Sequence, residues 1–299
     1  MEFGLSIAFH PLENYVPLAQ AAEENGFSAV SLADHLIYPG SFSVPYPYTP
    51  DGVPRFGEFD SFPDPWVAIT AMAAQTRVIQ FYTNVFVLPT RNPVQVAKIL
   101  ATADLFSNER VGLGIGMGWM PEEFAAAGQP FAARGKRADE MIDILRLLWS
   151  GEQVSYEGEH YTLDAMRQVP PPRRQIPIYV GGFSAPALRR AAHNDGWIAD
   201  LHSLSELQGL IENLDEHRAK AGTADRADYR IMAFGCTDAY EPAGFKAMAD
   251  MGVTVATTMP WVLHGHSMTP PLQVAIDSIK RFADEVISKV QVEATPAGK

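Results

Sequence analysis

The sequence predicts an α/β protein with the (β/α)8 barrel fold, in which eight parallel strands alternate with helices. Short apolar segments recur along the 299 residues, and each is followed by a segment with helical spacing. The apolar segments are nearly continuous, which is typical of strands buried on both faces of a parallel sheet. No proline- or serine-rich linker divides the chain, so residues 1–290 are expected to form one domain. A doubly wound open sheet is the alternative.

The expected strands and helices follow one another in strict order. The strands are expected at residues 3–8, 28–33, 78–87, 110–116, 176–180, 197–200, 229–235 and 253–257. The helices are expected at residues 16–25, 65–75, 93–106, 121–127, 134–149, 185–193, 204–221, 242–251 and 272–290. Asp64 and Pro65 mark one helix start, and Gly26 marks one helix end. Residues 291–299 are expected to be a disordered tail.

Two insertions interrupt this order, one after the second strand and one after the fourth. Residues 39–63 are rich in proline, tyrosine and glycine and show no periodicity, so we expect a functional loop or lid. Residues 150–175 contain two short strand-like segments around Glu157-Gly158-Glu159, which predicts a small hairpin.

Composition excludes several classes of function. The chain has 23 basic and 35 acidic residues, a net charge of −12, and no basic run, so a nucleic-acid partner is not expected. No apolar run reaches 18 residues and the N-terminus lacks a basic start, so neither a membrane span nor a signal peptide is expected. The single cysteine, Cys236, fits a reducing cytoplasm, and its apolar surroundings in the sequence predict a buried, inert thiol.

A glycine run follows Arg110, where Gly112, Gly114 and Gly116 alternate with apolar residues. This period of two leaves one face of the expected strand without side chains, so a large flat molecule could approach it. Close packing inside a barrel is the alternative. The dinucleotide-binding pattern G-x-G-x-x-G fails here because Met117 stands at the third glycine position.

Asp34 and His35 come directly after the second expected strand, where sites of barrel enzymes lie. A carboxylate beside an imidazole can fix its tautomer, and histidine is well suited to move a proton near neutral pH. These two residues are therefore candidates for catalysis. The alternative is that Asp34 caps a helix and that His35 is a solvated histidine.

Polar and glycine residues at two other strand ends are further candidates. Thr83 and Asn84 interrupt the third expected strand, which predicts a bulge beside an active site or at the barrel rim. Gly181 and Gly182 precede a helix start at Ser184, so their N–H groups and the helix dipole could hold a phosphate. Glycine pairs also form ordinary turns.

The remaining motifs are weaker. His264-x-His266 could bind a metal, but no clustered third ligand is evident, so no metal site is expected. The sequence has no G-x-S-x-G elbow and no P-loop, which disfavours hydrolase and NTPase functions. Four aromatic residues could either cover a flat ring or pack ordinarily: Phe42, Tyr46, Tyr48 and Trp119.

In combination, many short motifs resemble the luciferase-like monooxygenase superfamily and, within it, the branch of coenzyme F420-dependent oxidoreductases. The motifs are Ala21-Ala22-Glu23, Gly26-Phe27, Asp34-His35, Tyr46-Pro47-Tyr48, Arg91-Asn92-Pro93, Ala97-Lys98, Asp104-Leu105-Phe106-Ser107, Gly112 to Trp119, Glu123-Phe124, Arg134-Gly135, Glu140, Gly181-Gly182, Arg190-Ala191-Ala192 and Asp195-Gly196-Trp197.

The resemblance implies a barrel with a flavin or deazaflavin lying across the C-terminal ends of the strands. It implies cofactor contacts from Asp34, Asn84, Val85, Met117, Gly118, Glu122, Gly181 and Gly182. It also implies that His35 faces the substrate and that the peptide bond between Asn84 and Val85 is cis. The chain departs from the pattern at Trp119, where related dehydrogenases carry an acid.

The sequence is therefore interpreted as an F420-dependent oxidoreductase that transfers a hydride between the deazaflavin and a small organic substrate. An FMN-dependent monooxygenase on the same barrel is one alternative, and a non-catalytic flavin- or deazaflavin-binding protein is another. A cytoplasmic homodimer is expected from the resemblance.

Overall fold

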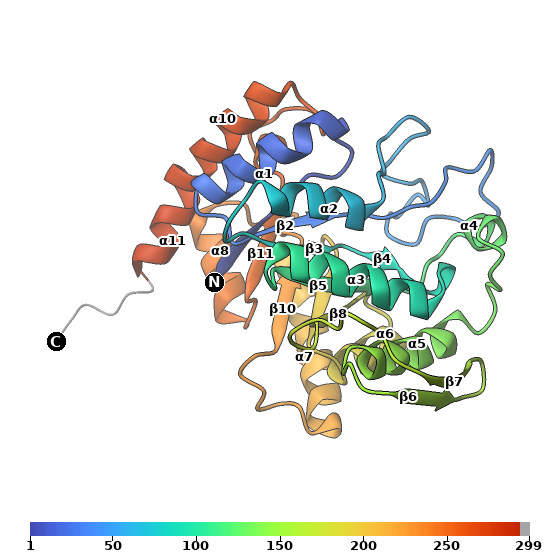
Figure 1. Ribbon diagram of the computed structural model, residues 1–299. Helices are drawn as coiled ribbons and strands as arrows, with labels where there is room; N and C mark the ends of the chain where they lie inside the picture. Colours follow the sequence, from blue (N-terminus) through green and yellow to red (C-terminus); the bar gives the residue numbers. More distant parts are fainter. Residues whose placement is uncertain (294–299) are drawn as a thin grey trace.

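The computed structural model describes residues 1–293 and confirms the (β/α)8 barrel (Figure 1). The barrel strands are β1 (Glu2–Ser6), β2 (Ala29–Leu32), β3 (Gln80–Thr83), β4 (Phe86–Val87), β5 (Val111–Gly116), β8 (Ile178–Gly181), β9 (Gly196–Ala199), β10 (Arg230–Ala233) and β11 (Val255–Thr258). All neighbouring pairs in this sheet are parallel. The sheet order is β3-β2-β1-β11-β10-β9-β8-β5-β4, and pairing of β3 with β5 closes it.

Helices cover the outside of the barrel, as Figure 1 shows. They are α1 (Tyr15–Glu24), α2 (Pro65–Ala74), α3 (Pro93–Ser107), α4 (Pro121–Ala126), α5 (Arg134–Leu148), α6 (Ala185–Ala192), α7 (Leu204–Ala221), α8 (Pro242–Asp250), α9 (Pro260–Leu263), α10 (Leu272–Phe282) and α11 (Ser288–Glu293). Short 3-10 turns are η1 (Leu12–Asn14) and η2 (Leu88–Thr90), and η3 (Ala283–Ile287) is a π-helical turn. Asp64 caps α2 by accepting from the N–H groups of Trp66 and Val67, as its sequence position indicated.

Three element boundaries differ from expectation. The third strand is divided into β3 and β4, because the chain breaks regular pairing at Asn84 and Val85. The short helix α9 follows β11 and was not expected. The last helical segment continues to Glu293, three residues past the expected domain end, and the remaining residues of the expected tail, 294–299, lie outside the described part.

The bare face of the glycine run in β5 is filled by neighbouring strands. A Cβ atom at Gly112 would lie 2.7 Å from the Tyr179 ring, and one at Gly114 would collide with the Thr83 carbonyl oxygen. Thr83 also binds this strand, since its hydroxyl donates to the Gly114 carbonyl at 2.7 Å. At Gly112 and Gly114 the expectation that this face admits a flat ligand is therefore wrong, because these glycines serve close packing inside the barrel, whereas Gly116 lines a pocket.

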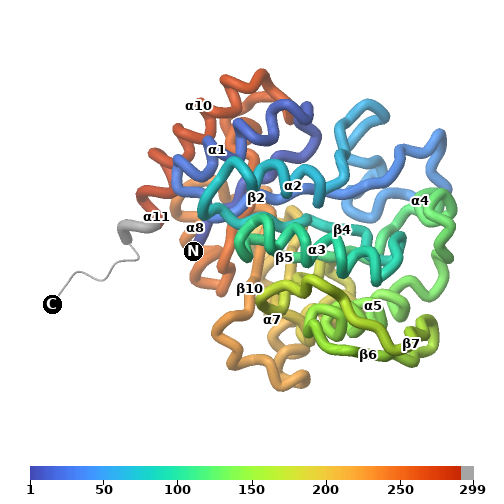
Figure 2. Tube along the Cα trace, viewed as in Figure 1, coloured from blue at the N-terminus to red at the C-terminus, as the bar shows by residue number. Residues whose placement is uncertain are grey.

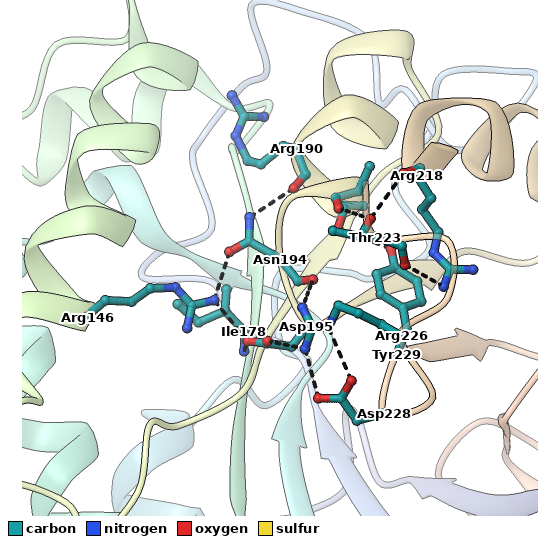
Figure 3. A network of polar contacts seen from close by, with 12 residues as sticks. Arg146, Ile178, Arg190, Asn194, Asp195, Arg218, Thr223, Arg226, Asp228 and Tyr229 are labelled. Atoms are coloured by element: carbon teal, nitrogen blue, oxygen red, sulfur yellow. Dashed lines mark hydrogen bonds and ion pairs between the residues drawn. The ribbon is translucent and has the colours of Figure 1, made fainter. Parts of the chain in front are cut away.

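Asp195 joins three elements at the N-terminal end of the barrel (Figure 3). Its carboxylate accepts from the Ile178 N–H of β8 at 2.9 Å, from Arg146 of α5 at 2.9 Å, and from Arg226 at 3.0 Å. Burial alone would raise the pKa of Asp195, but these hydrogen bonds hold it below its ordinary value. Because it lies opposite the strand ends where barrel sites form, this network is structural.

The two expected insertions are present. The segment 39–63 leaves the barrel between β2 and α2, on the side where α4 lies (Figure 2). Its Ser43 N–H donates to Glu122 at 2.8 Å, and Ser61 forms a bridge with Phe9 after β1. The second insertion is the antiparallel hairpin of β6 (Val154–Glu157) and β7 (Thr162–Met166). Glu140 of α5 holds it by accepting from the N–H groups of residues 159–161.

Candidate functional site

A pocket of about 210 Å³ opens at the C-terminal ends of the strands, and all eight barrel positions contribute to it. The segment 39–63 forms one wall. The lining residues are Ser6, Ala8, Phe9, Ala33, Asp34, His35, Tyr46, Tyr48, Arg55, Phe56, Phe62, Asn84, Val85, Val87, Gly116, Gly118, Trp119, Gly181, Gly182, Ile198, Asp200, Phe234, Met259 and Met268. Six of the eight residues expected to contact a cofactor are in this set. The other two, Met117 and Glu122, are outside it.

His35 is paired with a buried carboxylate. Its Nδ1 lies 3.3 Å from Oε1 of Glu123, and the same oxygen accepts from the Leu36 N–H at 2.6 Å. Glu123 is fully buried, whereas the His35 side chain keeps 12% of its surface exposed, on the pocket side. The carboxylate favours the tautomer with hydrogen on Nδ1, so Nε2 is the nitrogen left to meet a ligand. This arrangement can hold or move a proton at Nε2.

Asp34 lines the pocket but is held by an arginine. Arg91 donates to its two oxygens at 2.6 Å and 2.7 Å, and the Val87 N–H donates to one of them at 2.9 Å. Burial raises the pKa of the Asp34 carboxyl, and the Arg91 guanidinium opposes that rise. The pair ties the end of β2 to β4, and it fixes the backbone from which His35 projects.

The Asn84–Val85 segment forms the floor of the pocket, and its peptide bond is cis, as expected. The Val85 side chain fits between two glycines of neighbouring strands. A Cβ atom added at Gly116 would lie 2.5 Å from one methyl carbon of Val85. A Cβ atom added at Gly181 would lie 2.6 Å from the other methyl carbon. The glycines therefore make room for Val85, and Val85 brings the peptide plane to the pocket.

Aromatic rings cover the pocket. Phe42 stacks on Trp119 with ring centroids 5.5 Å apart, and Tyr46 contacts the same indole edge-on at 5.1 Å. Tyr46 also lies 5.3 Å from Tyr48. The four aromatic residues named from the sequence thus form one connected group, and three of them, all but Phe42, line the pocket.

The edge formed by Gly181 and Gly182 leads into α6. Gly182 has a φ of +103°, a conformation that favours glycine, and its carbonyl accepts from the Trp197 indole at 2.8 Å. Ser184 stands at the N-cap of α6 without a side-chain capping bond. The N-terminus of α6, with the positive end of the helix dipole, therefore follows the pocket-lining Gly182 by three residues, and Pro186 in its first turn offers no N–H.

Within the described residues, no group of three histidine, cysteine, aspartate or glutamate side chains is placed to hold a metal ion. His264 lies 4.0 Å from Glu285, away from the pocket lining. Among the same residues, no helix is long and apolar enough to cross a membrane. Cys236 is buried, as expected, and burial raises the pKa of its thiol to about 11.

A family model described as luciferase-like monooxygenase matches residues 1–241. The chain belongs to the luciferase-like monooxygenase family. An uncharacterized protein of Mycobacterium tuberculosis (strain H37Rv) is 36% identical over 293 residues, which cover 97% of this chain and all of the relative. An F420-dependent glucose-6-phosphate dehydrogenase of Gordonia bronchialis is 28% identical over 289 residues, 93% of this chain and 77% of the relative.

Two solved structures share the fold. An F420-dependent secondary alcohol dehydrogenase in complex with an F420-acetone adduct has a TM-score of 0.75 at 16% identity, over 96% of this chain and 99% of the other. A monooxygenase from Streptomyces bottropensis has a TM-score of 0.70 at 21% identity, over 97% of this chain and 99% of the other. The relatives and fold neighbours of this luciferase-like protein thus include both F420-dependent enzymes and monooxygenases.

Sequence reasoning missed three pocket-side residues of this luciferase-like barrel. Glu123 was named only within the motif Glu123-Phe124, without a role, and its neighbour Glu122 was expected to contact the cofactor instead. Arg55 and Asp200, which line the pocket as an ion pair with N···O distances of 2.9 Å and 3.1 Å, were not singled out. The position of Asp200 directly after a strand was the one available signal.

Proposed function

We propose that this luciferase-like protein is an F420-dependent oxidoreductase that transfers a hydride between the deazaflavin and a small organic substrate. The observation that carries the proposal is the His35–Glu123 pair, which offers a positioned proton-transfer group inside a pocket at the strand ends. The 28% identity with an F420-dependent dehydrogenase supports this cofactor. The homodimer and the cytoplasmic location stay predictions from the sequence.

The residues present fit such a cofactor. The Asn84–Val85 peptide plane offers a flat floor, and the pocket edge at Gly181 and Gly182 leaves the uncapped N-terminus of α6 beside it. In the proposal Asn84 and Val85 support the ring system, Gly118 lies at its edge, and the glycine pair and α6 hold the phosphate. When bound, the deazaflavin supplies the hydride chemistry, and the protein supplies position and electrostatics.

His35 is proposed to exchange the proton that accompanies hydride transfer. A substrate alcohol that loses a hydride from carbon also loses a proton from oxygen, and Nε2 of His35 would take it. Reduction of a carbonyl group would run in the opposite direction. Glu123 holds Nδ1 and so aims Nε2 at the pocket. Since Trp119 stands where related dehydrogenases carry an acid, the histidine is the proposed proton carrier at this site.

Asp34 is proposed as a positioning residue because Arg91 occupies both of its oxygens. It would act through the backbone at His35 and through Val87, whose N–H it accepts. This assignment separates the two adjacent candidates, with proton transfer at His35 and support at Asp34.

The test is a pair of binding titrations on one preparation, with F420 and with FMN, followed by assays of hydride transfer and of oxygen consumption. We expect tighter binding of F420, and hydride transfer to or from a substrate without oxygen consumption. Tight uptake of FMN without F420 binding, together with oxygen consumption, would favour the monooxygenase alternative. Cofactor binding without turnover of any kind would favour a non-catalytic binding protein.

A further inference from the structure

Building on the proposed function, we propose that the substrate is an uncharged, apolar ring compound carrying an alcohol or carbonyl group, and that sugar phosphates are excluded. The substrate would meet the part of the pocket lined by residues other than Asn84 and Val85. Two properties of that lining select the substrate, its aromatic surface and its charge.

The wall around His35 is aromatic. Phe56 lies 4.8 Å from the imidazole centroid, Phe62 lies 5.1 Å away, and Trp119 lies 6.3 Å away. Phe56 and Phe62 also contact each other edge-on at 5.1 Å. A substrate oxygen within reach of His35 Nε2 therefore has apolar rings around the carbon atoms attached to it, a setting that favours apolar groups.

Further along the lining, three more apolar side chains continue this surface. Phe234, Met259 and Met268 follow the last barrel strands and line the same pocket. Methionine side chains adapt to irregular apolar shapes, so this part of the lining can accept rings of different outline. Together these apolar side chains surround an oxygen atom that is bound at His35.

The charge of the lining excludes phosphate groups. Among the described lining residues, Arg55 is the one arginine or lysine, and Asp200 binds its guanidinium at 2.9 Å and 3.1 Å. Arg55 also donates to the Tyr48 carbonyl at 2.7 Å. The other charged lining group, Asp34, is an anion paired with Arg91. A phosphate held among these side chains, away from the helix N-terminus proposed for the cofactor, needs free arginine or lysine donors to replace its water, and here the one cation is already neutralised.

The experiment compares two probes, cyclohexanone and glucose 6-phosphate, by calorimetric titration of the full chain with and without F420. We expect cyclohexanone to bind at least about tenfold more tightly than glucose 6-phosphate, since desolvating an unpaired charge is costly. Equal or tighter binding of glucose 6-phosphate overturns the proposal. F420 binding is followed separately by its fluorescence. A chain that binds cyclohexanone but not F420 overturns the proposed cofactor and supports the substrate class.

Two variants test the role of the ion pair. Asp200→Asn leaves the Arg55 charge without an anionic partner, so inorganic phosphate should bind at least about tenfold more tightly than to the unaltered protein. The matched control is the double variant Arg55→Gln with Asp200→Asn, which lacks the cation and should lose that gain. The proposal is overturned if Asp200→Asn gains no phosphate affinity, or if the double variant keeps the gain.

Discussion

Val85 lies between Gly116 and Gly181, and a Cβ atom at either glycine would approach one of its two methyl carbons to 2.5 Å or 2.6 Å. Such distances do not occur between real side chains, so the two strands must stay bare where Val85 inserts. This relationship explains why the glycine run continues to the pocket. Gly116 and Gly181 both accommodate Val85, and all three residues line the pocket.

Gly116→Ala should therefore destabilise the barrel through Val85. Overpacking of a close-packed core typically costs about 1–3 kcal/mol, and we expect a loss of that order in chemical denaturation. Val85→Ala removes both methyl carbons, so Gly116→Ala in that background should cost clearly less. If Gly116→Ala costs the same stability in the unaltered protein and in the Val85→Ala background, the contact with Val85 is not the cause of the loss. Titration of the same variants with F420 measures whether the change beside Val85 also weakens cofactor binding.

His35→Ala should lower turnover by about 10²–10⁴-fold, the usual contribution of a general acid or base, with little change in the dissociation constant of F420. Added imidazole should restore part of the rate, which a purely structural role of His35 would not permit.

Glu123→Gln keeps an acceptor for the Leu36 N–H but removes the carboxylate beside Nδ1. It should reduce kcat while leaving cofactor affinity unchanged. Full activity in both variants would remove His35 from the mechanism.

Arg91→Ala should leave the buried Asp34 carboxylate without its charged partner. Removal of one member of a buried ion pair typically costs about 3–5 kcal/mol, and we expect a loss of that order in the free energy of unfolding. The side chains of the pair are 15% and 2% exposed, so solvent screens this interaction little. The matched control is Arg91→Ala with Asp34→Ala, which leaves no unpaired charge. It should be less destabilised than Arg91→Ala alone, and a greater loss would argue against the pair.

Asp195→Asn should weaken the network at the N-terminal end of the barrel. The pKa of Asp195 is lower in the folded protein than in the unfolded chain, so its ionised form stabilises the fold above the unfolded value, about 3.9. That stabilisation is lost as the pH falls through the folded pKa. We expect a loss on the order of 2 kcal/mol at pH 7. The difference between the two proteins should shrink below about pH 4, and a constant difference across this range would contradict the assignment.

Much of the fold and part of the site could be predicted from the sequence, for one physical reason. Parallel strands end on the same side of a barrel, so polar residues and glycines after strands, such as His35 and Gly181, could be placed together without coordinates. The sequence could not show that Glu123, and not Glu122, turns inward. Both acids occupy the first turn of α4, and tertiary packing decides which one meets His35.

The pairing of Arg55 with Asp200 was also beyond sequence reasoning. The two residues are 145 positions apart, and one of them lies in a segment without periodicity. Likewise, spacing alone could show that one face of β5 is bare but could not show what fills it. It is filled by Tyr179 and Thr83 of other strands and by Val85, which lies between β3 and β4.

The segment 39–63 supplies part of the pocket wall, yet within the described chain none of its residues belongs to the hydrophobic cluster of the barrel. It is attached by aromatic contacts with His35 and Trp119 and by polar contacts such as Arg55 with Asp200. We therefore expect substitutions there to alter the molecules that the pocket accepts while the hydrophobic cluster of the barrel stays unchanged. Part of the pocket's selectivity for its ligand therefore depends on a segment outside the barrel core. That segment can change in descendants of this protein while the barrel core is conserved.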